Sequence, residues 1–129
     1  VYKMNKIIFS AILLLGFIAQ ACASDWVKIG YGDDFVTFGD VSSRTRDRAW
    51  FETRYTKPQK LSNGKFYMSE KQLFEFSCND KSYRTLTVVW YSRSGMQVDL
   101  DTLSHTREYI IPDTRGEVMY DFVCFHSPR

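Results

Sequence analysis

Apolar and polar positions alternate along most of the chain between residues 27 and 111, which is the two-residue period of half-buried β-strands. The clearest example is Ala49–Lys57, which places Phe51 and Tyr55 on one face. Pro58 is expected to end that strand, because proline cannot donate to a strand ladder. The strands predicted in this way are Val27–Tyr31, Phe35–Phe38, Ala49–Lys57, Gln72–Cys78, Tyr83–Tyr91 and the two weaker candidates Met96–Leu100 and Tyr109–Ile111.

The best hairpin signal joins Gln72–Cys78 to Tyr83–Tyr91 through a polar four-residue turn. The second of these strands is rich in Thr, Val, Trp and Tyr, which pack well on a pleated surface. Before this hairpin, Gln59–Ser69 contains the turn dipeptide Asn63-Gly64 and is expected to form a long excursion from the sheet. Strands separated by short turns predict an antiparallel sheet of about six strands.

The spacing of apolar residues changes from two to about 3.6 near the C-terminus, where a helix is predicted. Thr114 and Glu117 have the spacing of a capping box, in which two side chains satisfy free backbone N–H groups. Apolar residues then recur at helical spacing, at Val118, Met119, Phe122, Val123 and Phe125. Tyr120 and Cys124 widen this stripe, which predicts a largely buried helix. Because one sheet face cannot cover so wide an apolar surface, a homodimer is predicted to cover its outer side.

The cysteines indicate a disulfide that ties this helix to the sheet. Cys78 shares a strand face with Phe74 and Phe76, and Cys124 lies on the predicted helix. The third cysteine, Cys22, lies in the export signal described below. The two cysteines that remain in an exported chain predict one structural bond, since export compartments are oxidising. The predicted fold class is therefore α+β: an antiparallel sheet with a C-terminal helix packed on one face and tethered by a disulfide.

The start of the chain reads as an export signal. Residues 4–23 combine a basic start, the apolar run Ile7–Ile18 and a small residue on either side of Cys22. The apolar run is shorter than the about twenty residues that a membrane-spanning helix needs. Acylation of Cys22, as in a bacterial lipoprotein, stays open as an alternative, although Gln20 fits a lipobox poorly. The remaining residues, 24–129, are long enough for one domain.

Charge argues against nucleic acid as the main partner. The chain has 17 Lys and Arg against 15 Asp and Glu. Two of the lysines, Lys3 and Lys6, precede the predicted mature domain, which is left with no net charge. Nucleic-acid binding depends on an excess of Lys and Arg that neutralises phosphates.

Candidate catalytic and metal-binding residues are few. No nucleophile elbow or phosphate-binding loop occurs, and His105 and His126 do not have metal-ligand spacing. Asp99 and Asp101 share a strand face and could divide acid and base roles, but a solvated strand end explains them as well. We therefore predict neither a catalytic residue, nor a metal, nor a cofactor.

The candidate binding residues lie in one basic stretch. Arg44, Arg46 and Arg48 alternate along it and lead directly into Trp50. Arg and Trp often dominate the binding energy at protein interfaces. These four residues are the predicted contact site for a protein partner.

The hairpin and helix together resemble a known family. The run FEFSCNDKSYRTLTVVWYSRSG, followed by PDTRGEVMYDFVC, resembles the surface-adhesin protein E family of Gram-negative bacteria. The positions that carry the resemblance are Cys78, Tyr83-Arg84, Trp90-Tyr91, Gly95, Pro112-x-Thr114 and Cys124. The resemblance extends over essentially the whole predicted mature domain.

This resemblance implies a noncatalytic, exported domain that lies in the periplasm or on the outer cell surface. It implies an adhesin-like role, with host extracellular-matrix proteins as the class of partner. A periplasmic protein that binds a small ligand or an envelope partner between sheet and helix stays open as the alternative. An enzyme would have to depend on Asp99 and Asp101 alone.

Overall fold

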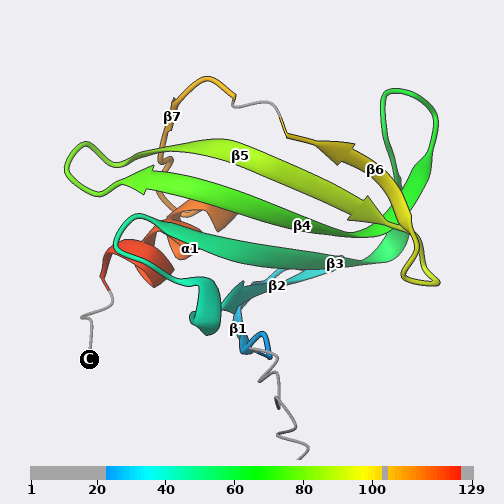
Figure 1. Cartoon of the computed structure of the whole chain (residues 1–129), viewed down its shortest axis with the longest axis horizontal. Helices are drawn as coiled ribbons and strands as arrows, with labels where there is room; N and C mark the ends of the chain where they lie inside the picture. The colour runs from blue at the N-terminus through cyan, green and yellow to red at the C-terminus, as the bar shows by residue number, and fades with distance from the viewer. Residues whose placement is uncertain (1–22, 103–104, 126–129) are drawn as a thin grey trace, which may run out of the picture.

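The described residues form one antiparallel sheet of seven strands with a single α-helix packed against it (Figure 1). A computed structural model describes residues 23–102 and 105–125. Nearly all of the predicted export signal, Cys22 included, lies outside these residues. The elements in chain order are β1 (Trp26–Tyr31), β2 (Phe35–Asp40), the 3₁₀ turn η1 (Val41–Ser43), β3 (Arg48–Lys60), β4 (Phe66–Ser77), β5 (Ser82–Tyr91), β6 (Gln97–Asp101), β7 (Glu108–Tyr109) and α1 (Arg115–Cys124).

The strand order confirms the predicted antiparallel sheet. Strands β1 to β6 pair in sequence order, each antiparallel to the next, and β7 pairs with the start of β5 beyond the end of β6. Short turns make this the simplest way for consecutive strands to pair. We call the face covered by α1 the helix face and the opposite one the outer face.

The prediction that Pro58 ends its strand is wrong. Strand β3 continues to Lys60, and its pairing with β4 is interrupted between Arg54 and Gln59. Pro58 lies in this interruption, where no N–H group is needed for the ladder. The predicted excursion is therefore the far end of the β3–β4 hairpin, closed by a turn in which Gly64 adopts a φ of 88°.

The helix begins where expected, but the predicted capping box is not formed. Thr114 is the N-cap, yet its hydroxyl donates to the Ile111 carbonyl at 2.6 Å and makes no cap hydrogen bond. The preceding residue, Asp113, has a φ of 60°, so the chain turns sharply just before the helix. This turn brings the Thr114 hydroxyl to the Ile111 carbonyl instead of to the free N–H groups of α1.

The core lies between α1 and the helix face of the sheet. Phe51 on β3 is fully buried, and its ring contacts three others from β4 and α1: Phe74, Phe76 and Phe122. The predicted disulfide is present, since Cys78 and Cys124 are bonded with their Cα atoms 5.6 Å apart. The bond joins the end of β4 to the last turn of α1.

The sheet also covers the sides of the helix. Gly39 on β2 gives room for the Phe122 ring, since a Cβ atom there would lie 2.8 Å from it. Val118 packs beside Gly30 on β1, where an added Cβ atom would lie 3.5 Å away, an ordinary contact distance. All apolar residues of α1 are therefore buried or half-buried, and only Phe125, just past the helix, is exposed. The helix does not present the uncovered apolar side from which a homodimer was predicted.

Candidate binding site

The four predicted contact residues are divided between the two faces of the sheet. The Arg44 guanidinium lies over the Phe122 ring at 4.5 Å and donates to the Phe122 carbonyl at 3.2 Å. Arg44 therefore ties the loop after η1 to the last turn of α1, where cations are favourable. Arg48 and Trp50 alternate with the buried residues of β3 and so lie on the outer face. Arg46 is exposed in the loop between them.

Arg48 belongs to a cluster that the sequence pattern did not reveal. Its Nη2 lies 2.7 Å from Oε2 of Glu75 on β4. The other carboxylate oxygen, Oε1, is 2.9 Å from Nε of Arg84 on β5 and 3.1 Å from Nη2 of Arg107, just before β7. We call Arg48, Arg84 and Arg107 around Glu75 the arginine cluster.

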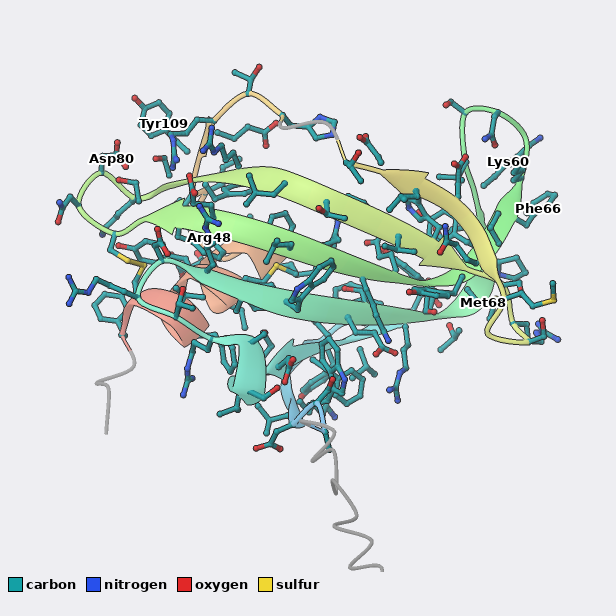
Figure 2. The ribbon with its side chains drawn as sticks, in the orientation of Figure 1. Arg48, Lys60, Phe66, Met68, Asp80 and Tyr109 are labelled. Atoms are coloured by element: carbon teal, nitrogen blue, oxygen red, sulfur yellow. A yellow bond between two sulfur atoms is a disulfide. The ribbon has the colours of Figure 1, made fainter. Side chains whose placement is uncertain are left out.

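Strand register brings this cluster together. Arg48 pairs with Glu75, and Glu75 pairs with Arg84, so the three side chains form a row across three adjacent strands. Arg107 is oriented further by its Nη1, which donates to the Ser82 hydroxyl at 3.2 Å. Figure 2 shows Arg48 at the end of the sheet where Asp80 marks the β4–β5 turn. The sequence alone would predict this row only if Arg48 or Arg84 were already known to lie opposite Glu75 on a neighbouring strand.

Glu75 keeps its negative charge in this setting. Burial raises the pKa of its carboxyl, but hydrogen bonds from Arg84 and Arg48, together with their charges, outweigh burial and hold the pKa below its usual range. The three guanidiniums remain 36–48% exposed while Glu75 is 12% exposed. One carboxylate thus orients three cations and neutralises one of them. Asp47 and Asp80 lie at the rim, bonded to Thr45 and Ser82.

A hollow of about 470 Å³ lies on the helix face, between β1–β2 and the start of α1. Phe35, Thr37 and Arg115 are among the residues that line it. Behind it, Arg115 donates to the Tyr55 hydroxyl at 3.2 Å, and Tyr55 donates to the Glu70 carboxylate at 2.9 Å. Burial, opposed by the hydrogen bond from Arg115, raises the pKa of Tyr55 to about 12, so this phenol is neutral at physiological pH.

Asp99 and Asp101, the candidate acid and base, each contact another side chain. Asp99 accepts from the Asn63 amide at 2.8 Å, and Asp101 lies 2.9 Å from Nε2 of His105. Within residues 23–102 and 105–125, no group of three or more His, Cys, Asp and Glu side chains could hold a metal ion. No helix in the same residues is long and apolar enough to cross a membrane.

Comparison with known proteins gives one match. The model of the surface-adhesin protein E family matches residues 26–125, which includes every strand and the helix. Neither the curated proteins nor the solved structures contain a match.

Proposed function

The chain belongs to the surface-adhesin protein E family, and on that premise we propose that residues 24–129 form a noncatalytic module that binds another protein. The family implies an exported, surface-located protein with an adhesin-like role. The proposed partner class is host extracellular-matrix protein, and the proposed contact site is the arginine cluster with the neighbouring Arg46.

The arginine cluster is the observation that carries this proposal. Guanidinium groups recognise carboxylates through paired N–H donors, and Glu75 holds three of them in place before a partner arrives. Preorganised side chains lose less entropy on binding. The acidic rim formed by Asp47 and Asp80 favours a protein that offers a carboxylate flanked by basic groups over a uniform polyanion.

Export by a cleaved signal is part of the same proposal. We propose cleavage after Ala23, which leaves Ser24 as the first residue of the mature protein, and display on the outer surface. The periplasm is the alternative compartment. Protease treatment of intact cells distinguishes the two, because only a displayed domain is cut. A lipid on Cys22, found by intact-mass measurement, would replace the proposed cleavage by anchoring.

Removing two cations of the cluster is expected to abolish most partner binding. In the Arg48→Gln, Arg84→Gln variant, Arg107 still compensates Glu75, so the fold is retained. Loss of one hot-spot arginine costs about 2 kcal/mol or more, so a single such contact among the two is enough to lower the affinity for immobilised matrix and plasma proteins at least about thirtyfold. Surface plasmon resonance against a panel of such proteins measures this.

Arg54→Gln is the matched control. Arg54 lies on the same strand and outer face as Arg48 and forms an ion pair with Glu52, whose side chain is 10% exposed, close to the 12% of Glu75. Its loss should change partner affinity less than twofold, and urea unfolding of both variants checks that each is folded under the conditions of the binding measurement. If both variants lose binding to the same extent, or if neither variant loses binding, the arginine cluster is not part of the contact site.

The hollow beside α1 supports a second candidate function, the binding of a small ligand. Its Arg115 guanidinium suits a carboxylate, and its Phe35 ring suits an apolar or aromatic group. Native mass spectrometry of the exported protein tests this candidate. A bound small molecule that is absent from an Arg115→Gln variant would favour it over protein binding.

A further inference from the structure

Two turns lie at the end of the sheet opposite the arginine cluster, and the first of them contacts β6. These are residues 57–69, at the end of the β3–β4 hairpin, and residues 91–98, which join β5 to β6 (Figure 1). The Asn63 amide donates to the Asp99 carboxylate at 2.8 Å, and Lys65 Nζ donates to the Val98 carbonyl at 3.4 Å. We call this surface the tip.

The tip is positively charged although the predicted mature domain is neutral. Its two segments contain four basic residues, Lys57, Lys60, Lys65 and Arg93, and no acidic one. All four are exposed. The nearest acidic partners lie outside the segments: Asp34 is 3.4 Å from Lys57, and Asp99 is held by Asn63. The β1–β2 turn, which contains Asp33 and Asp34, lies at the same end beside Thr56 and Lys57. Among the described residues, Lys60, Lys65 and Arg93 are therefore the cations of the tip that form no ion pair.

Large apolar side chains are exposed beside these cations. Phe66 is 59% exposed and Met96 is 70% exposed, and Leu100 on β6 is 47% exposed. The Lys60 ammonium lies 5.7 Å from the centre of the Phe66 ring. Figure 2 shows Lys60, Phe66 and Met68 together at this end, away from Arg48 and Asp80. Exposed apolar side chains gathered at one place mark an interaction surface.

From this combination we infer that the tip docks on a phospholipid surface with acidic headgroups. Apolar side chains can enter the boundary between headgroups and acyl chains, while Lys and Arg reach the phosphates with their long stems. Composition favours a lipid over a protein here. Lysine is depleted in protein interfaces and arginine is enriched. The tip has three lysines and one arginine, whereas the cluster at the other end has arginines only.

The geometry makes docking compatible with partner binding. Strand β3 runs from Arg48 in the cluster to Lys60 in the tip, and these two residues pair with Glu75 and Phe66 of β4, nine positions apart and so separated by about 30 Å. A domain that rests on a membrane by its tip would present the arginine cluster away from that surface. The inference does not depend on the proposed function, since it uses different residues.

Vesicle sedimentation of the exported protein tests the inference. The probes are vesicles of phosphatidylcholine alone and of equal parts phosphatidylcholine and phosphatidylglycerol. We expect binding to the acidic vesicles only, with release by added salt. Each cation near an acidic surface is worth roughly fivefold in partition coefficient, so Lys60→Gln, Lys65→Gln, Arg93→Gln should lower the partition coefficient by about 100-fold at low salt.

Two further variants test whether binding depends on where the cations lie and on the exposed apolar side chains, and not only on the net charge of the domain. Lys28→Gln, Arg46→Gln, Lys81→Gln makes the same change in net charge with exposed residues outside the tip, and should retain binding within about threefold. Phe66→Ser, Met96→Ser should weaken binding to acidic vesicles at least tenfold and leave the salt dependence in place.

The inference is overturned if wild type does not sediment with acidic vesicles, or if the charge control loses as much binding as the tip variant. Retention on heparin or on an acidic protein without vesicle binding would also overturn it. Binding of the tip variant to matrix proteins is measured in parallel, because the proposed function predicts that this binding is unchanged. Failure of one proposal is thereby distinguished from failure of the other.

Discussion

Replacing Cys78 and Cys124 together by serine is expected to lower the free energy of unfolding by about 2–5 kcal/mol. The bond closes a segment of 46 residues, so its loss gives the unfolded chain much more freedom. It also holds the end of α1, a ten-residue helix too short to be stable on its own. For a domain with a typical net stability of about 5–15 kcal/mol, this is a large fraction.

Urea unfolding followed by circular dichroism measures this effect. Wild type in a thiol reductant is the matched comparison, and its stability should fall to that of the double variant. The variant itself should not respond to the reductant. If the variant and oxidised wild type unfold at the same urea concentration, the bond is dispensable and packing alone holds α1 on the sheet.

Phe51→Ala should cost about 3–5 kcal/mol, the usual range for a large aromatic residue removed from a closed core. Phe51 is fully buried, and its ring centre lies 5.6–6.1 Å from those of Phe74, Phe76 and Phe122. The neighbouring strands and the disulfide prevent collapse around the lost ring, so a cavity remains. The loss should appear as a lower urea midpoint with an unchanged slope.

Phe66→Ala is the control for this prediction. Phe66 has the same side chain and lies in the same β3–β4 hairpin, but it is 59% exposed. Its replacement should change the free energy of unfolding by no more than about 0.5 kcal/mol. Similar losses in the two variants would mean that the ring cluster around Phe51 is not the centre of the core.

The predictions for the disulfide and for Phe51 rest on different information. The disulfide follows from the sequence, because two cysteines in an exported chain have one intramolecular pairing and both lie on apolar faces. The central place of Phe51 depends on tertiary structure. Alternation places it on the same face as Tyr55, but only the position of α1 decides that Phe51 is covered by the Phe122 ring while Tyr55 meets the Arg115 side chain at the start of the helix.

Strand register explains why the sequence pattern does not reveal the arginine cluster. Alternation assigns a residue to a face of its own strand but carries no information on its neighbours across the sheet. Arg48 was therefore grouped with Arg44, four positions earlier, which the loop after η1 directs to the helix face. Its actual neighbours, Glu75 and Arg84, are distant in sequence and are brought together by pairing with β4 and β5.

The fold class, the helix near the C-terminus and its disulfide follow from the sequence, because the spacing of apolar residues and the number of cysteines are properties of the chain itself. The course of β3 through Pro58 and the covering of the sides of the helix by the sheet depend on tertiary structure. It also placed the arginine cluster and the tip at opposite ends. These features depend on which strands pair and in what register, and that is set by the packing of the whole sheet against α1.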